Sequence, residues 1–73
     1  MLRRRAFRDI LSLIRHFLEA NPGYYTAFQI GEKIGADQRV VERHLDILRE
    51  LGHLEETRDK AGVRLVGWKR VVG

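Results

Sequence analysis

Residues 37–54 read DQRVVERHLDILRELGHL, and this stretch decides the fold. Asp37 is a residue type that favours helix N-caps, and Gly52 is one that ends helices. Between them apolar side chains recur with helical spacing, namely Val40, Val41, Leu45, Ile47, Leu48 and Leu51. The other face is polar, with Gln38, Arg39, Glu42, Arg43, Asp46, Arg49 and Glu50. The pattern predicts an amphipathic helix over residues 37–51.

Two further helices are expected before this one. Residues 26–34 predict a short helix with Thr26 as its N-cap and Gly35 at its end, where a left-handed backbone costs little. About three residues then separate it from Asp37, which is the spacing of a helix-turn-helix. Residues 4–20 predict a first helix, which ends before the only proline, Pro22.

The first helix has an apolar arc close to 180° wide, broader than the roughly 100° that a surface helix needs. Two explanations stay open. Either the rest of the domain covers the whole arc, or a spare flank that includes Leu11 and Leu18 meets a second copy of the chain. The second explanation predicts a homodimer through this helix.

After residue 52 the periodicity changes to that of strands. Residues 54–58 and 63–68 flank Asp59-Lys60-Ala61-Gly62, which predicts a hairpin with a four-residue connection and positive φ at Gly62. Gly67 predicts a bulge or an edge. Residues 23–25 predict a short extended piece, and the aromatic side chains of Tyr24, Tyr25 and Trp68 are expected to close the core.

The order of elements predicts one mainly helical α+β domain over residues 1–73. It is a winged helix-turn-helix with three helices and a C-terminal hairpin wing at residues 54–69. The chain has 73 residues, of which 44% are hydrophobic and 33% charged, so it can bury one modest core. It has no cysteine and no apolar run near the length of a membrane span, so we expect a soluble, cytoplasmic protein with no membrane partner.

The net charge of +4 favours a polyanionic partner, although a basic surface can also be merely well solvated. The charge is uneven along the chain: residues 1–24 carry +3, residues 25–52 carry −1 and residues 53–73 carry +2. The arginines at 3, 4, 5 and 8 can add phosphate contacts, or they can simply be solvated.

Exposed side chains at the start of a recognition helix reach base edges in the major groove of double-stranded DNA. Here these are Gln38, Arg39, Glu42 and Arg43. Arginine pairs with guanine, glutamine with adenine, and glutamate accepts from cytosine. The alternative is a surface network of ion pairs, Arg39 with Glu42 and Arg43 with Asp46. Asp46 and Glu50 oppose deep insertion because phosphates repel them.

The hairpin tip brings three cations, Arg58, Lys60 and Arg64, around a turn. Such a wing can lie along the minor groove and pair with phosphates. The alternative is an ordinary polar tip that protects edge strands from aggregation.

No enzyme chemistry is apparent. His16, His44 and His53 share no ligand spacing, so we expect no metal site, and His44 falls in the apolar arc of its helix as a hydrogen-bonded, partly buried residue. Ser12 is the only serine and has no catalytic partner. We expect no cofactor and no small-molecule ligand.

Residues 37–54, together with TAFQIGEKIG at residues 26–35, resemble the helix-turn-helix segment of ArsR-like and MarR-like winged-helix regulators. The likeness covers about residues 24–68. It implies that Thr26 and Gln29 touch phosphates, that Gln38, Arg39, Glu42 and Arg43 face the groove, and that a dimer reads two half-sites. The chain departs from the family because it lacks a long fourth helix and a cysteine sensor, and because His53 stands where an apolar residue is usual.

The leading hypothesis is therefore a sequence-specific DNA-binding regulator of transcription. Two alternatives remain. The near-neutral middle of the chain suits a winged helix that contacts proteins in a transcription or replication assembly. Basic chain ends suit an architectural protein that binds DNA without reading its sequence.

Overall fold

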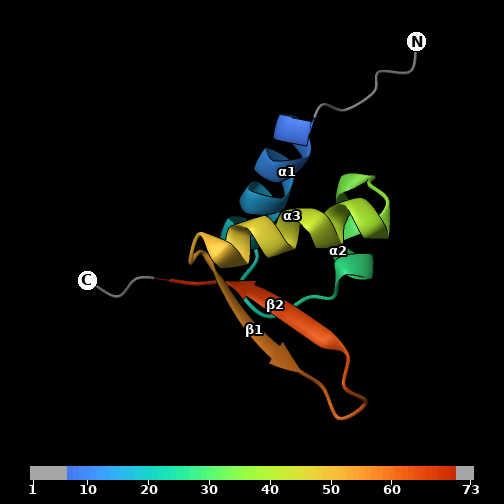
Figure 1. Ribbon diagram of the computed structural model, residues 1–73, viewed down its shortest axis with the longest axis vertical. Coiled ribbons are helices and arrows are strands. Elements are labelled where there is room, and N and C mark those ends of the chain that lie inside the picture. Colours follow the sequence, from blue (N-terminus) through green and yellow to red (C-terminus); the bar gives the residue numbers. More distant parts are fainter. Residues whose placement is uncertain (1–6, 71–73) are drawn as a thin grey trace.

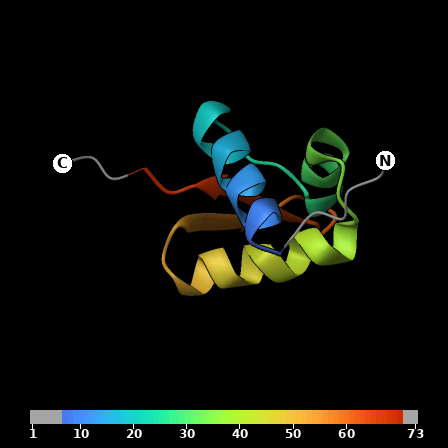
Figure 2. The same cartoon turned by 90° about the horizontal axis from the view of Figure 1, so that it is seen from above.

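The computed structural model describes residues 7–70. Its elements are α1 (Phe7–Ala20), α2 (Ala27–Ile34), α3 (Gln38–Glu50), β1 (Leu54–Arg58) and β2 (Arg64–Trp68). In Figure 1 the hairpin extends away from the helices, and Figure 2 shows α1 and α2 on the same side of α3. This is the winged-helix arrangement that the element order predicts. The predicted start of the first helix at Arg4 lies outside the described residues.

The ends of the helices follow the capping residues in the sequence. Thr26 is the N-cap of α2 and Asp37 is the N-cap of α3, whose side chain accepts a hydrogen bond from the Arg39 backbone nitrogen at 2.8 Å. Gly35 follows α2 with φ of 71°, a conformation that favours glycine. The short turn through Ala36 then leads directly into α3, as in a helix-turn-helix.

The wing is an antiparallel hairpin in regular register, from Leu54 opposite Trp68 to Arg58 opposite Arg64. Its connection is residues 59–63, one residue longer than predicted, because Val63 lies before β2. The Asp59 carboxylate accepts hydrogen bonds from the backbone nitrogens of Ala61 and Val63, at 2.8 and 2.9 Å. Gly62 has φ of 83°, as its place in the turn predicted.

Of the bulge or edge predicted at Gly67, the bulge is wrong, because Gly67 pairs in register with Glu55. The sheet has two strands, so the other side of β2 is an edge that meets only an isolated bridge between Tyr25 and Val66. A Cβ atom at Gly67 would lie 2.6 Å from the Gly23 carbonyl oxygen. The glycine is therefore required by the close approach of another backbone segment, which strand periodicity cannot reveal.

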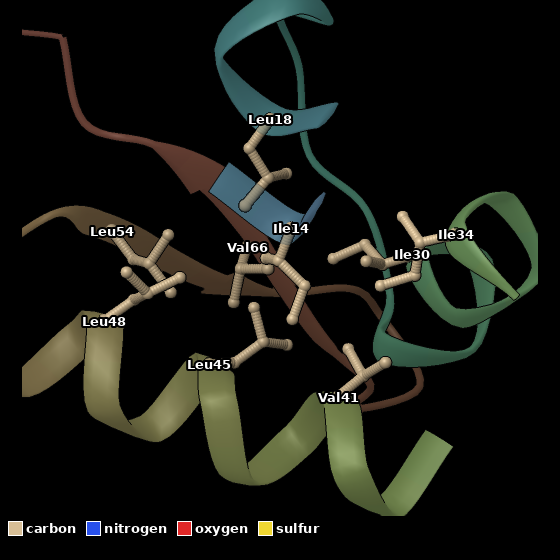
Figure 3. Close-up of a cluster of buried hydrophobic side chains, with 9 residues drawn as sticks. All are labelled: Ile14, Leu18, Ile30, Ile34, Val41, Leu45, Leu48, Leu54 and Val66. Atoms are coloured by element: carbon tan, nitrogen blue, oxygen red, sulfur yellow. The ribbon is translucent and has the colours of Figure 1, made fainter. Parts of the chain in front are cut away.

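One hydrophobic cluster joins all five elements (Figure 3). Its buried side chains are Ile14 and Leu18 of α1, Ile30 and Ile34 of α2, Val41, Leu45 and Leu48 of α3, Leu54 of β1 and Val66 of β2. Ile14, Leu18, Ile30 and Val41 have no exposed surface at all. Among the described residues, no helix is long and apolar enough to cross a membrane.

The burial of two leucines bears on the predicted faces. Two explanations were open for the flank of the first helix that includes Leu11 and Leu18; the domain fully buries Leu18, so of the two only Leu11 keeps partial exposure. Leu51, expected in the core, is 62% exposed. It is the C-cap of α3, and the chain turns at Gly52, so its side chain leaves the buried arc.

His44 is fully buried, deeper than the partial burial predicted. Its Nδ1 lies 2.7 Å from the Val40 carbonyl oxygen one turn earlier in α3. Since a carbonyl can only accept, Nδ1 is the nitrogen that carries the proton in this hydrogen bond. The predicted hydrogen-bonded role of His44 is confirmed.

The aromatic residues have different roles, although all three were expected to close the core. Tyr25 packs edge-on against Phe17, with ring centroids 4.9 Å apart. Trp68 is partly buried and stacks against His53, with ring centroids 5.3 Å apart. Tyr24 is 47% exposed, so it does not close the core. Its hydroxyl instead donates to the Glu55 carboxylate at 2.8 Å.

Candidate nucleic-acid interface

The exposed face of α3 begins with the residues that the sequence assigned to base contact. Gln38, Arg39, Glu42 and Arg43 are all exposed, because the buried side of the helix is occupied by Val41, His44, Leu45 and Leu48. Helical spacing places Gln38 and Glu42 one turn apart, and Arg39 and Arg43 likewise. The first two turns of α3 thus present two guanidinium groups, one amide and one carboxylate to solvent.

The predicted ion pairs on this face are absent from the described part of the chain. Neither Arg39 nor Arg43 takes part in a salt bridge within residues 7–70. Glu42 is instead approached by the Gln38 amide, at a long 3.5 Å. The guanidinium groups of both arginines are therefore exposed to solvent, with no carboxylate of residues 7–70 paired to them.

The acidic residues further along α3 are engaged by arginines. Asp46 is paired with Arg64 of β2, with Oδ1 3.0 Å from Nη1, and lies 4.0 Å from Arg49. Arg49 also lies 3.6 Å from Glu50 and 3.6 Å from Glu56 of β1, and Arg64 Nε donates to Glu56 at 2.7 Å. We call these five residues the α3–wing network. It has two guanidinium groups against three carboxylates, so it offsets part of the negative charge that the sequence had set against insertion.

Arg64 lies beside the turn as predicted, opposite Arg58, but its side chain is engaged within the protein. It is 23% exposed and contacts Asp46 of α3 and Glu56 of β1. Its Nη2 atom is buried and has no hydrogen-bond partner among the described residues.

The wing tip itself carries Arg58 and Lys60. Arg58 Nη1 donates to the Gly62 carbonyl at 2.9 Å and so braces the turn. Lys60 is exposed and forms no salt bridge with a described residue. A turn held by Asp59 and Arg58 therefore presents the Lys60 ammonium group to solvent.

Thr26 and Gln29, the residues implied to touch phosphates, form a capping box at the start of α2. Thr26 Oγ1 accepts from the Gln29 backbone nitrogen at 3.1 Å, and Gln29 Oε1 accepts from the Thr26 backbone nitrogen at 2.9 Å. Both oxygens are engaged in the cap. The Thr26 hydroxyl hydrogen and the Gln29 amide nitrogen are still chemically able to donate.

The fold brings part of the predicted site together. Thr26, Gln38, Glu42 and Arg64 line one hollow of about 80 Å³ between the start of α2, α3 and β2. Arg39 and Arg43 lie on the exposed face of α3, while Arg58 and Lys60 lie at the turn of the hairpin. The wing is joined to α3 through Arg64 of β2 and Glu56 of β1, which contact Asp46 and Arg49 of the helix.

Sequence reasoning missed the joining residues, Arg49 and Glu56. The spacing of Asp46 and Arg49 was a signal for one pair, since residues three apart on a helix are neighbours. The contacts of Arg49 and Arg64 with Glu56 depend on how the hairpin packs against α3, for which the sequence holds no signal. In the described range no group of three or more histidine, aspartate or glutamate side chains is placed to hold a metal ion.

Comparisons with known proteins support the fold. No protein-family model matches the chain, and neither does any curated protein. One matching solved structure is the crystal structure of the Zalpha domain of PKZ from Carassius auratus in complex with Z-DNA. It is 26% identical with a TM-score of 0.74, and the match covers 89% of this chain and 100% of that chain. The winged-helix prediction is confirmed, while the likeness to ArsR-like and MarR-like regulators stays a prediction.

Proposed function

We propose that this protein binds double-stranded DNA, with the first two turns of α3 in the major groove and the wing on the backbone or in the minor groove. The observation that carries the proposal is the pair of exposed arginines, Arg39 and Arg43, which no described carboxylate engages. Guanidinium groups that are exposed on one face of a helix and have no carboxylate partner suit bidentate contact with guanine. Lys60 supplies a phosphate contact from the wing.

The charge arrangement on α3 supports this orientation. Asp46 and Glu50 lie in the second half of the helix, and both are within salt-bridge distance of Arg49. The first half therefore carries two free cations against one carboxylate, Glu42, and the second half carries a net charge of −1 that Arg64 of β2 offsets. A recognition helix contacts bases through its N-terminal part, so the free cations are where they are needed.

The structural neighbour adds independent support, because that winged-helix domain is described in complex with Z-DNA. A protein of the same fold and matching length has thus been seen with a nucleic acid. We propose further that the contacts of the present chain are sequence-specific and that it regulates transcription.

Fluorescence anisotropy of a labelled duplex, titrated at several salt concentrations, tests the proposal. The wild type should bind with an affinity that falls steeply as salt rises, because phosphate contacts release counterions. The Arg39→Ala, Arg43→Ala variant should bind about tenfold or more weakly and lose preference among sequences selected from a random library.

A matched control is Arg15→Ala in α1. Arg15 is exposed and carries the same charge, but it pairs with Glu19 at 3.1 Å on another element. This variant should bind nearly as the wild type does. If the wild type has no affinity for duplex DNA even at low salt, the proposal is wrong. That result would favour the alternative of a winged helix that contacts proteins.

A second candidate is recognition of left-handed DNA, which the Z-DNA complex of the neighbour favours. An alternating CG duplex at low salt distinguishes the two. Titration with a protein that prefers Z-DNA inverts the near-ultraviolet circular dichroism of the duplex. A protein that reads the right-handed major groove binds without that inversion.

We also propose a homodimer through α1, in which Leu11 is the remaining exposed part of the predicted flank. Two copies would read two half-sites about one helical turn apart. Sedimentation at micromolar concentration tests this. A dimer that Leu11→Glu converts to a monomer is the expected result, and a clean wild-type monomer contradicts it.

A further inference from the structure

The wing is tied to α3 by two arginines that each contact both elements. Arg64 joins Asp46 of α3 to Glu56 of β1, at 3.0 and 2.7 Å, and Arg49 extends from α3 to Glu56 at 3.6 Å. The side chains of Arg64 and Glu56 are only 23% and 26% exposed, so water screens their pair less than it screens the other pairs of this chain. Arg64 is the first residue of β2 and pairs with Arg58 beside the turn, and Glu56 is the middle residue of β1. These contacts therefore hold the turn-side half of the hairpin against α3.

Arg64 occupies this place at a cost, since its Nη2 is buried without a hydrogen-bond partner among residues 7–70. A planar guanidinium holds two carboxylates in a fixed relative geometry, which a lysine ammonium on a flexible stem does not. The Arg64 guanidinium, which contacts Asp46 of α3 and Glu56 of β1, is therefore suited to fix the direction of the hairpin relative to α3.

We infer that Arg64 and Asp46 are positioning residues that set the angle between α3 and the wing, so that Lys60 and the first turns of α3 meet one duplex together. Arg64 then does not contact DNA directly. The inference rests on the proposed function, because the angle matters only if helix and wing share a ligand. It replaces the sequence-based assignment of Arg64 as a contact of the wing tip.

Asp46 gives the sharpest test, because two explanations predict opposite signs. If α3 meets DNA only as a charged surface, Asp46→Asn removes a repulsive charge and affinity rises. If Asp46 positions the wing through Arg64, the same variant loosens the contact between β2 and α3, and affinity falls by about three- to tenfold. Glu50→Gln is the matched control, because it removes the same charge from the same helix but touches only Arg49.

The experiment measures duplex binding by anisotropy for the wild type, Asp46→Asn, Glu50→Gln and Arg64→Lys. We expect Asp46→Asn to bind more weakly than the wild type, and Glu50→Gln to bind as well or better. Arg64→Lys keeps the charge yet should also bind more weakly, with an unchanged slope of log affinity against log salt. Lys60→Gln, a proposed phosphate contact, should instead reduce that slope by about 0.9.

A second measurement uses the free protein and does not depend on DNA. Residual dipolar couplings of backbone amides give the orientation of residues 54–68 relative to α3. This orientation should change in Asp46→Asn and Arg64→Lys and stay unchanged in Glu50→Gln, with far-ultraviolet circular dichroism verifying that each variant is folded.

The outcomes distinguish the positioning role of Asp46 and Arg64 from the proposed binding of duplex DNA. An unchanged wing orientation in Asp46→Asn overturns the positioning role, and so does an affinity equal to or above that of Glu50→Gln. If the wild type binds no duplex, the proposed function fails, and the orientation measurement alone decides whether these residues set the wing angle.

Discussion

At the scale of single residues, a close contact between backbone segments explains a glycine that helix propensity would disfavour. Gly31 lies inside α2, where glycine is less favourable than alanine by about 0.5–1 kcal/mol. A Cβ atom there would lie 2.6 Å from the Ala36 carbonyl oxygen and 3.6 Å from Val41 Cγ2. The turn between α2 and α3 passes too close for any side chain, so this glycine permits the helix-turn-helix.

We therefore expect Gly31→Ala to destabilise the protein. The clash is with backbone, which cannot rotate away, and overpacking of this kind costs about 1–3 kcal/mol, more than the gain in helix propensity. Urea denaturation followed by circular dichroism measures the change. Gly62→Ala is the control. A Cβ atom at Gly62 would meet no other atom within 4 Å, so this variant tests the strain of a positive φ without a steric clash. A stabilised Gly31→Ala variant would contradict the close contact.

Tyr24 shows how one neighbouring charge alters a titration. The Glu55 carboxylate accepts the hydrogen bond of the Tyr24 hydroxyl and repels the phenolate, and both effects raise the pKa of Tyr24 above its ordinary 10.0. A raised pKa means that the contact stabilises the fold fully below pH 10 and stops doing so as the pH rises through the raised value.

Glu55→Gln removes both effects, so the pKa of Tyr24 should move down toward 10.0. Absorbance titration of the phenolate in the two proteins measures the difference, since Tyr25 is common to both. The stability gap between wild type and variant should be constant below pH 10 and narrow above it. Identical titration curves would show that the hydrogen bond is not formed in solution.

At the scale of elements, the ends of the helices depend on a few polar contacts. The capping box of Thr26 and Gln29 satisfies amides at the start of α2, which has only eight residues and cannot hold itself together. At the other end of the chain, Arg70 Nη2 donates to the Glu19 carbonyl at 2.9 Å. Since α1 has no basic residue in its last turn, this distant arginine supplies the positive charge that its C-terminus favours.

Loss of the cap should be measurable. Thr26→Ala is expected to lower the free energy of unfolding by about 1 kcal/mol, because it leaves a first-turn amide unsatisfied. Thr26→Ser keeps an accepting oxygen and should stay within a few tenths of a kcal/mol of the wild type. Thermal melts of the two variants make the comparison. Equal losses in both would show that the threonine methyl group matters rather than the cap.

Arg70 has a matched neighbour for its own test. We expect Arg70→Ala to destabilise the protein by about 0.5 kcal/mol through loss of an exposed contact with the end of α1. Lys69→Ala removes the same charge, but no side-chain hydrogen bond or salt bridge of Lys69 to a described residue is present. Denaturant midpoints distinguish them, and equal effects would mean that charge alone is responsible.

At the scale of the whole molecule, the charge of the described part is nearly balanced. Residues 7–70 contain 11 basic and 10 acidic side chains, and the rest of the net charge of +4 comes from the arginines at 3, 4 and 5. If the protein binds DNA as proposed, base contact and long-range attraction should therefore come from different parts of the chain.

Replacing the arginines at 3, 4 and 5 by glutamine should reduce the salt slope of DNA binding by up to about 2.7, at about 0.9 per phosphate contact. The order of preference among DNA sequences should not change. Anisotropy titrations at several salt concentrations provide both quantities. An unchanged slope would place all phosphate contacts within residues 7–70.

The sequence determined the elements and their order. Periodicity placed the buried faces, and Thr26, Asp37, Gly35 and Gly62 marked helix ends and the hairpin turn, because capping and positive φ act within a few residues. The exposure of Gln38, Arg39, Glu42 and Arg43 also followed from helical spacing alone.

Only the tertiary structure decided contacts between elements. The burial of Leu18, the exposure of Leu51, the backbone packed against Gly67 and the turn of Arg64 toward Asp46 all depend on packing angles. Residues far apart in the sequence meet there, and the same local pattern is compatible with several ways of meeting. The sequence therefore predicted the two exposed arginines of α3, and the packing decided that a third arginine, Arg64, joins the wing to the helix.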